Sequence, residues 1–271
     1  MRLKKSLGQH WLTDRSYQTR IVAALDPAPG DEVVEIGPGA GALTQHLAGR
    51  VRRLVLVELD ASLATGLERR FPGAGVTVVP ENVLRVDLPA LVERWDAAKV
   101  VGNIPYRITS PLLEKILGSR PRPARIVLTL QKEVADRLAS PEGRKSYGAL
   151  TVGVRAVADV EVLFTIPRAA FRPAPDVDSA TVRLVPHAPP RLTPEEERDL
   201  RGLARAAFSR RRKQIGTILR DAPDYGLGID SLRPLLADLG VSPQDRPETL
   251  APETFVALAR ALRGLGRPLG G

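Results

Sequence analysis

The chain contains no cysteine, and this absence excludes two kinds of site. Without thiols it forms no disulfides and offers no thiolate ligands to a metal. Its three histidines, His10, His46 and His187, are too scattered to give a recognisable metal-ligand spacing. We therefore expect no metal cofactor.

Long apolar runs are also missing. The N-terminus is basic but lacks the apolar segment of a secretion signal, and no stretch approaches the roughly 18 to 20 apolar residues that a membrane span needs. We expect a cytoplasmic protein with no membrane partner. With 271 residues, of which 43% are hydrophobic, the chain can form one large domain and one small domain.

Positive charge is in excess, but unevenly along the chain. The net charge of +9 divides into +4 for residues 1–20, +2 for residues 21–190 and +3 for residues 191–271. A basic excess at both ends predicts that a polyanion, and hence nucleic acid, contacts the N-terminal arm and the C-terminal region. An arginine-rich genome is the alternative explanation for the pI near 10.3.

From residue 31 onward, short apolar runs alternate with amphipathic stretches. This pattern predicts a doubly wound, Rossmann-like α/β fold in which helices cover both faces of a parallel sheet. Further strands at the end of this region would add antiparallel members at one edge. The expected strands are residues 33–36, 54–57, 76–79, 100–101, 126–130, 150–157, 160–165 and 180–185, and the expected helices are residues 43–48, 61–70, 112–117 and 134–138.

Capping residues and prolines indicate where the domains begin and end. Asp14 suits the N-cap of a helix running to about Leu25, after an arm over residues 1–13. Pro186, Pro189 and Pro190 mark a boundary, and Thr193 is placed to cap the next helix. We expect a large domain at residues 14–188 and a small α-helical domain at residues 189–271. Its helices are predicted to reach residue 208 and to cover residues 211–219, 229–239 and 253–265.

The segment Asn103-Ile104-Pro105-Tyr106 follows an apolar strand and predicts a site for a flat ring that bears an amine. The Asn103 side chain and a neighbouring backbone carbonyl can both accept hydrogen bonds from an NH2 group. Pro105 has no N–H and a fixed φ, which keeps that carbonyl out of a strand ladder. Tyr106 can stack on the ring. An ordinary Asn-X-Pro turn is the alternative interpretation.

A glycine-rich turn, Gly37-Pro38-Gly39-Ala40-Gly41, follows the first predicted strand, and Glu58 ends the second, 21 residues after Gly37. In open α/β sheets a carboxylate at that place accepts from ribose hydroxyls, so we expect a cofactor that contains ribose. The third glycine comes one position earlier than in the dinucleotide fingerprint, so a pyrophosphate is not indicated. A tight strand-to-helix connection would explain the glycines alone.

Four segments together carry a resemblance to a known family. They are Asn103–Tyr106, the Leu-Gln-Lys-Glu-Val at 130–134, the Phe-Arg-Pro-Ala-Pro-Asp-Val-Asp-Ser at 171–179, and Arg211-Arg212-Lys213. With them the chain, from about residue 7 to 219, resembles the S-adenosylmethionine-dependent ribosomal RNA adenine N6,N6-dimethyltransferases of KsgA type.

The resemblance implies a class I methyltransferase domain at residues 14–188 and an RNA-binding domain at residues 189–271. It implies S-adenosylmethionine as cofactor and dimethylation of two adjacent adenosines in the 3′-terminal hairpin loop of small-subunit rRNA. The implied partner is an immature 30S subunit, so the protein would take part in ribosome biogenesis. We expect it to act as a monomer.

The resemblance also assigns cofactor contacts. Gly37 and Gly39 would approach the methionine part of the cofactor, Glu58 its ribose, and Leu12 would close over it. Two positions depart from the family pattern. His10, in Gly8-Gln9-His10-Trp11-Leu12, stands where the family has Asn in Gly-Gln-Asn-Phe-Leu, and Asn82 stands where the family has an Asp facing the cofactor adenine. The first contact would be lost or taken over by His10 or the backbone, and Asn82 would accept without a charge.

Adenine N6 is a poor nucleophile because its lone pair is delocalised into the ring. Oδ1 of Asn103 and the carbonyl of Ile104 or Pro105 would accept its two hydrogens and orient it, which is catalysis by position and electrostatics. By the resemblance, Tyr106 would stack on one face of the flipped base and Phe171 on the other. A core position is the alternative for Phe171.

Phosphate contacts are expected from Arg210, Arg211, Arg212 and Lys213 and from the arm residues Arg2, Lys4 and Lys5. A solvated helix face is the alternative for the first group. Three other functions stay open: a DNA adenine or protein glutamine methyltransferase, a large-subunit rRNA methylase of the macrolide-resistance type, and a catalytically weak RNA-binding assembly factor. Ile104 argues against the first, because it stands where that class has the first proline of an Asn/Asp-Pro-Pro-Tyr turn.

Overall fold

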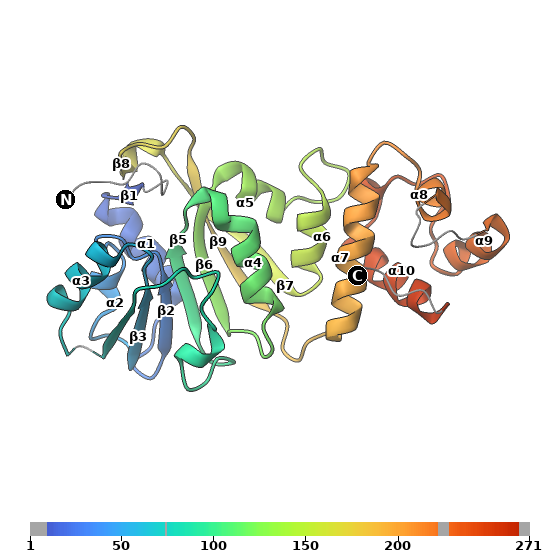
Figure 1. Ribbon diagram of the computed structural model, residues 1–271. Coiled ribbons are helices and arrows are strands. Elements are labelled where there is room, and N and C mark those ends of the chain that lie inside the picture. Colours follow the sequence, from blue (N-terminus) through green and yellow to red (C-terminus); the bar gives the residue numbers. More distant parts are fainter. Residues whose placement is uncertain (1–9, 74, 222–227, 266–271) are drawn as a thin grey trace. The chain divides into compact units, whose positions relative to one another are not determined.

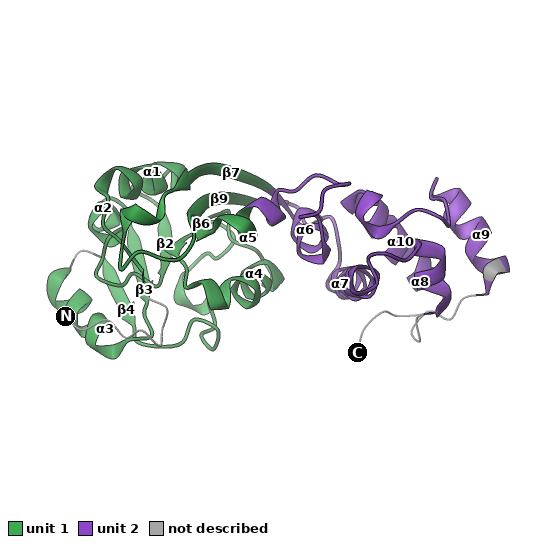
Figure 2. Cartoon of the chain, turned by 90° about the horizontal axis from the view of Figure 1, so that it is seen from above, with its two compact units in different colours: residues 1–135, 160–186 green, residues 136–159, 187–271 purple. Residues whose placement is uncertain are grey.

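The computed structural model describes residues 10–73, 75–221 and 228–265 (Figure 1). The arm residues Arg2, Lys4 and Lys5 lie outside the described part. The chain forms two compact units: unit 1 contains residues 1–135 and 160–186, and unit 2 contains residues 136–159 and 187–271 (Figure 2). The second boundary falls close to the expected one. Residues 136–159, however, which we assigned to the large domain, group with the C-terminal helices.

Unit 1 is built on a seven-stranded sheet with the order β4-β3-β2-β5-β6-β9-β7. Strands β4, β3, β2, β5 and β6 pair in parallel, and β9 pairs antiparallel with β6. This confirms the doubly wound sheet with an antiparallel member toward one edge. The strands are β2 (Glu32–Ile36), β3 (Arg53–Val57), β4 (Val76–Val79), β5 (Lys99–Asn103), β6 (Arg125–Gln131), β7 (Ala158–Ile166) and β9 (Ser179–Pro186).

The central strand β2 is buried at all five residues because helices cover both faces of the sheet. Alternate strand residues such as Val33, Leu54 and Val101 share one core cluster with apolar residues of α1 (Arg15–Leu25), α2 (Thr44–Leu47) and α3 (Ala61–Arg70). Helix α4 (Thr109–Gly118) lies on the opposite face from α1 and α2 (Figure 2). The alternation of side chains therefore fixes which helix covers which face.

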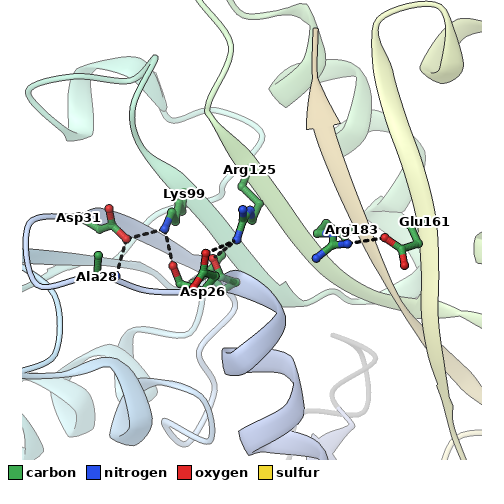
Figure 3. A network of polar contacts seen from close by, with 8 residues as sticks. Asp26, Ala28, Asp31, Lys99, Arg125, Glu161 and Arg183 are labelled. Atoms are coloured by element: carbon green, nitrogen blue, oxygen red, sulfur yellow. Dashed lines mark hydrogen bonds and ion pairs between the residues drawn. The ribbon is translucent and has the colours of Figure 1, made fainter. Parts of the chain in front are cut away.

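A polar network ties α1 to the amino ends of two strands (Figure 3). Nζ of Lys99 at the start of β5 lies 2.7 Å from Oδ2 of Asp31 and also donates to the Asp26 carbonyl. Nη1 of Arg125 at the start of β6 donates to Oδ2 of Asp26 at 3.1 Å and to the Leu25 carbonyl at 3.1 Å. The network lies at the amino ends of these strands. Open α/β sheets bind their ligands at the opposite, carboxyl ends.

Both predicted N-caps are confirmed. Oδ1 of Asp14 accepts from the Ser16 N–H at 2.9 Å at the start of α1. Thr193 and Glu196 cap α7 (Pro194–Ser209) reciprocally: the Thr193 N–H donates to Oε2 of Glu196 at 2.8 Å, and the Glu196 N–H donates to Oγ1 of Thr193 at 3.2 Å.

The strand predicted at residues 150–157 is wrong, because Ala149–Arg155 form helix α6. The β-branched residues of this run favour a strand locally, but packing decides. The helix buries Thr151, Val152 and Val154, and it packs against α7 and α10. Oγ1 of Thr151 accepts from the Gly148 N–H at 3.1 Å and donates to the Arg137 carbonyl at 2.6 Å, which fixes the first turn.

Unit 2 is helical. Its core includes Phe255, whose ring lies 5.8 Å from that of Phe208, and the ring of Tyr147 meets Phe208 edge-on at 5.7 Å. The helix expected from Arg211 begins only at Ile215, because the Lys213 N–H donates to the Arg210 carbonyl at 2.8 Å and closes a turn.

The remaining elements of the two units are α5 (Lys132–Leu138), α8 (Ile215–Asp221), α9 (Ile229–Asp238), α10 (Pro252–Gly264), β1 (Trp11–Leu12), β8 (Phe171–Arg172), η2 (Pro89–Leu91), η3 (Tyr106–Ile108), η4 (Arg168–Ala170) and η5 (Pro247–Thr249). None of the helices in the described residues is long and apolar enough to cross a membrane.

Candidate active site

A pocket of about 390 Å³ lies at the carboxyl ends of the parallel strands of unit 1. It is lined by residues of β1, of the glycine-rich turn after β2, of the end of β3 and of the turn after β5. Nearly all sequence-predicted site residues of unit 1 line it: His10, Leu12, Gly37, Gly39, Glu58, Asn82, Asn103, Pro105 and Tyr106. Nine of the ten site residues predicted in unit 1 therefore lie in the pocket wall, and Phe171 is the exception.

The glycines act by letting backbone and side chains approach closely. Gly39 has φ +58°, and a Cβ there would lie 3.4 Å from the Trp11 indole. At the end of β5, a Cβ on Gly102 would lie 2.6 Å from the Ile36 carbonyl oxygen, which no larger residue tolerates. Glycine is therefore favoured at position 39 by its positive φ and required at position 102 by the close approach of β2.

Glu58 is buried and fixed by backbone donors. Oε2 accepts from the Gly39 N–H at 3.0 Å, and Oε1 accepts from the Asp60 N–H at 2.9 Å. Burial raises the pKa of this carboxyl, and these hydrogen bonds oppose the rise. Each carboxylate oxygen keeps a second lone pair, so the group can still accept from the two hydroxyls of a ribose.

Glu35 is a second carboxyl beneath the same turn, to which we assigned no role from the sequence. Oγ1 of Thr44 donates to its Oε2 at 2.8 Å. Burial raises the pKa of Glu35 to about 8, so the group is largely protonated at neutral pH. The sequence signal that points to Glu35 is its place inside the apolar run predicted as the strand at residues 33–36.

Asn82 lines the pocket, but its oxygen is already engaged. Oδ1 accepts from the Leu84 N–H at 3.0 Å in a local turn of the kind that Asn favours. A further hydrogen bond from a ligand would have to use the second lone pair of that oxygen.

The orientation of the Asn103 amide is set by the N-terminal strand. Nδ2 donates to the His10 carbonyl at 2.9 Å, and because a carbonyl only accepts, the amide nitrogen must face it. Oδ1 is therefore the end available to an incoming amine. The Pro105 carbonyl accepts from the Ile108 N–H at 3.1 Å to begin η3, which favours the Ile104 carbonyl as the second acceptor.

His10 lies beside Tyr106, the ring that we expect to stack on the base. Its ring stacks on Tyr106 with centroids 5.9 Å apart, and Nδ1 lies 2.9 Å from the Pro173 carbonyl oxygen, so Nδ1 carries a proton. The Tyr106 hydroxyl is 2.9 Å from Oγ of Ser179 at the start of β9. Burial raises the pKa of Tyr106. Ser179 thus anchors the aromatic ring, a role that the motif at 171–179 did not reveal.

Phe171 does not face the pocket. Its side chain is 1% exposed and belongs to the core cluster, and in the short ladder of β1 and β8 it lies opposite Leu12. The expectation that Phe171 stacks on a base is therefore not met in this conformation. Apolar packing holds the ring in the core, the alternative that the sequence left open.

Trp11 contributes a wall of the pocket that sequence reasoning did not assign. Its indole lies over Gly39, and Nε1 is shielded from solvent and has no hydrogen-bond partner among the residues that the structure describes. Leu12 beside it is 3% exposed. Within the described residues, no group of three or more His, Asp and Glu side chains is placed to hold a metal ion.

In unit 2, the four predicted phosphate contacts divide into two kinds. Arg210, Arg212 and Lys213 are exposed. Arg211 is turned inward: Nη1 donates to the Lys145 and Tyr147 carbonyls at 2.6 and 3.1 Å, and Nη2 donates to the Arg144 carbonyl at 2.9 Å. Its Nε lies 3.7 Å from Oε2 of Glu248. Arg211 therefore has a structural task that the sequence did not indicate.

Known proteins share this fold and these motifs. The model of a family described as ribosomal RNA adenine dimethylase matches residues 1–224. A ribosomal RNA small subunit methyltransferase A from Geobacter metallireducens is 42% identical over 272 residues, covering 98% of each chain. One from Geobacillus kaustophilus is 38% identical, covering 97% of this chain and 92% of the relative.

Solved structures agree with the sequence comparison. A dimethyladenosine transferase from Plasmodium falciparum superposes with a TM-score of 0.85 at 26% identity, covering 96% of this chain and all of that chain. The 23S rRNA methyltransferase ErmE superposes with a TM-score of 0.73 at 28% identity, covering 93% of this chain and 99% of that chain. The glycine-rich turn, Glu58 and the Asn103 turn thus lie on the fold that these rRNA methyltransferases share, and the chain belongs to the ribosomal RNA adenine dimethylase family.

Proposed function

We propose that this enzyme uses S-adenosylmethionine to dimethylate N6 of two adjacent adenosines in the 3′-terminal hairpin loop of small-subunit rRNA. It acts as a cytoplasmic monomer on the immature 30S subunit. Relatives that match nearly the whole chain are named small-subunit rRNA methyltransferases. The observation that carries the chemistry is the Asn103 amide, which the His10 carbonyl orients so that Oδ1 is the available acceptor.

The pocket residues fit the cofactor. Glu58 presents a carboxylate to a diol, and the turn of Gly37 and Gly39 leaves room where a Cβ would otherwise stand. The buried N–H of Trp11 has no acceptor in the described part of the chain, which suits a ligand with acceptor atoms. When bound, S-adenosylmethionine supplies an electrophilic methyl group on a sulfonium.

The residues of the Asn103 turn provide orientation and acceptors. Oδ1 of Asn103 and the Ile104 carbonyl would accept the two N6 hydrogens of an adenine and direct the nitrogen lone pair toward the methyl group. Tyr106, anchored on Ser179, would stack on the base. After one methylation N6 still carries one hydrogen, so one acceptor continues to hold it for the second transfer. The released proton passes to solvent, and no strong base is needed.

Two substitutions separate the amine site from the cofactor site. Asn103→Ala should abolish methyl transfer while S-adenosylmethionine binding, measured by calorimetry, falls little. Glu58→Ala should weaken that binding by about 1.5–3 kcal/mol, as expected for a hydrogen bond to a charged group. If Asn103→Ala loses the cofactor as severely as Glu58→Ala does, the assignment of the two sites is wrong.

The product identifies the target. Small subunits that lack these methyl groups, incubated with enzyme and cofactor, should yield N6,N6-dimethyladenosine by mass spectrometry of their nucleosides. Tyr106→Phe keeps the ring but loses the bond to Ser179, so it should retain substantial activity, whereas Tyr106→Ala should lose most of it. Monomethyladenosine as the only final product would contradict the proposal.

A large-subunit target is the second candidate, because ErmE shares the fold over 93% of this chain. The same incubation with large subunits or protein-free 23S rRNA tests it. Methylation confined to large-subunit RNA would favour this candidate over the first.

A further inference from the structure

The first inference concerns a surface of unit 2 where two separate segments present positive charge. Residues 141–145 form an exposed loop that carries Arg144 and Lys145, and the turn before α8 carries Arg212. The guanidinium of Arg211 joins the two segments, because it donates to the carbonyls of Arg144, Lys145 and Tyr147. Exposed cations far apart in the sequence are thereby held beside one another.

The acidic groups around this surface are mostly engaged elsewhere. Glu248 faces Arg211, and its carbonyl accepts from the Gly143 N–H at 2.7 Å, which anchors the start of the loop. Glu142 lies 3.7 Å from Nη1 of Arg155.

Among the described residues, Asp221 offsets part of the charge of the turn. Its pKa is lowered first by the hydrogen bond from Arg220 and further by Arg210 and Lys213. The charge of those two cations is therefore partly balanced. No carboxylate of the described residues forms an ion pair with Arg144, Lys145 or Arg212.

We propose that Arg144 and Lys145, held beside Arg212 by Arg211, contact the phosphates of the rRNA substrate. This inference rests on the proposed function and extends its RNA contacts to a loop outside the Arg-Arg-Lys segment. Arginine and lysine on a rigid, exposed surface position RNA through its backbone and without reading its sequence. The guanidinium of Arg211 holds the loop in place, because it donates hydrogen bonds to the loop carbonyls.

The test is the salt dependence of binding to unmethylated small ribosomal subunits. The double variant Arg144→Ala/Lys145→Ala should bind more weakly, and its slope of log K against log salt should be shallower by about 1.4 to 1.8, because each lost phosphate contact removes about 0.7 to 0.9. The control Arg198→Ala/Arg233→Ala removes the same charge from exposed positions on α7 and α9 of the same unit and should leave the slope nearly unchanged.

Equal slopes for the wild type and the Arg144→Ala/Lys145→Ala variant would overturn the inference, as would an equal loss in the control, which would reduce the effect to net charge. If the wild type itself fails to bind small subunits while binding large ones, the proposed function fails instead.

A second inference comes from the indole of Trp11, which is an independent observation. Nε1 is a donor only, it is buried, and no acceptor among residues 10–73, 75–221 and 228–265 reaches it. It lies over Gly39, and the backbone N–H of Gly39 is already bound to Glu58. The acceptor that this donor lacks is therefore expected at the glycine-rich end of the pocket rather than at the Asn103 end.

We infer that the Trp11 N–H donates to the carboxylate of the cofactor's methionine moiety. That carboxylate is the only anionic group of S-adenosylmethionine. A buried neutral donor forms a stronger hydrogen bond with a charged acceptor than with a neutral one. The indole must shift away from Gly39 to admit it, and the two-residue ladder of β1 with β8 is a small element that can allow such a movement. Trp11 is thus a positioning residue for the cofactor.

Binding measurements and one spectroscopic signal test this inference. Trp11→Phe keeps an apolar ring and removes the N–H, so affinity for S-adenosylmethionine should fall about tenfold to 150-fold, while affinity for its decarboxylated analogue stays unchanged. The chain has two tryptophans, and Trp95 donates to Oγ of Ser119, so Trp95→Phe assigns the two indole ¹⁵N–¹H signals. The Trp11 signal of the wild type should shift downfield with S-adenosylmethionine and not with the analogue.

An unshifted Trp11 signal, or equal losses of affinity for both ligands in Trp11→Phe, would overturn the assignment. Failure of the wild-type protein to bind S-adenosylmethionine at all would instead contradict the proposed cofactor.

Discussion

Two carboxyl groups lie close together under the glycine-rich turn, and their surroundings give them different roles. Glu58 lines the pocket and accepts from two backbone N–H groups, so its charge is partly compensated. Glu35 is fully buried, has one hydroxyl donor in Thr44, and is also affected by the charge of Glu58. A neutral Glu35 beside an ionised Glu58 is the arrangement that costs least, because two buried charges of one sign repel.

Glu35 should make stability depend on pH. Burial raises its pKa from 4.5 to about 8, so the folded state binds a proton that the unfolded state has lost between these values. Its contribution to the free energy of unfolding is therefore greatest below about pH 4.5 and is lost as the pH rises through about 8. Urea unfolding of the wild type and of Glu35→Gln, from pH 6 to 9, measures the difference. The variant should gain on the wild type with rising pH. A constant difference would show that Glu35 is ionised throughout.

The same residues show what a sequence reveals at this scale. Asn103, Gly39 and Glu58 were predictable because they follow apolar strands, and the carboxyl ends of parallel strands converge at one edge. Partners that depend on a distant segment were not predictable. The contact of the His10 carbonyl with Asn103 spans 93 residues, and that of Tyr106 with Ser179 spans 73. No local pattern encodes either contact.

Among the elements, the pairing of β1 with β8 connects the N-terminal strand to the core. The strands are two residues long, and Thr13 adds an N–H bond to the Ala170 carbonyl at 2.9 Å. Phe171 is buried beneath this pair and lies opposite Leu12. Because β1 and the preceding residue His10 lie in the pocket wall, packing of Phe171 can influence the site without contact to a substrate.

Phe171 variants separate packing from stacking. Phe171→Ala should lower the free energy of unfolding by about 3–5 kcal/mol through the cavity that it leaves, and methyl transfer should fall with it. Phe171→Leu keeps most of the apolar volume, so it should cost less than about 1.5 kcal/mol and retain most activity. Denaturant unfolding and dimethyladenosine yield are the measurements. A stable Phe171→Leu protein without activity would restore the stacking role.

Helix α6 shows where element prediction fails. Its run of Val and Thr residues is typical of a strand, and the sequence gives no sign that this run packs against α7 and α10. The helices α7 and α10, by contrast, begin with clear signals: Thr193 with Pro194, and Pro252 at the first turn. Caps are local and readable, whereas the choice between strand and helix for an apolar run depends on its packing partners.

At the scale of the whole molecule, the chain divides its tasks between the two units. All residues that line the pocket belong to unit 1, and the exposed cations Arg144, Lys145, Arg212 and Lys213 belong to unit 2. The sequence located the C-terminal boundary by its prolines. It did not reveal that residues 136–159 leave the large unit, because the contacts that hold them, such as the Tyr147 hydroxyl on the Leu250 carbonyl at 2.7 Å, span about a hundred residues.

This division predicts opposite effects for two neighbouring arginines. Arg211→Ala removes three donated hydrogen bonds to carbonyls and should lower the free energy of unfolding by at least about 1.5–3 kcal/mol. Arg212→Ala, at an exposed position, should change stability by less than about 0.5 kcal/mol while weakening RNA binding. Arg211→Lys should be intermediate in stability, because an ammonium lacks the planar fork that reaches several carbonyls.

Hydrogen exchange and calorimetry separate these effects. In Arg211→Ala, amides of residues 143–147 should exchange faster, whereas Arg212→Ala should leave them protected. Affinity for S-adenosylmethionine should stay unchanged in both variants, since neither arginine touches the pocket. RNA binding should weaken in Arg211→Ala as well, because Arg144 and Lys145 lose their fixed position. Normal protection and stability in Arg211→Ala, with a loss of RNA affinity equal to that of Arg212→Ala, would instead show that Arg211 contacts phosphate directly.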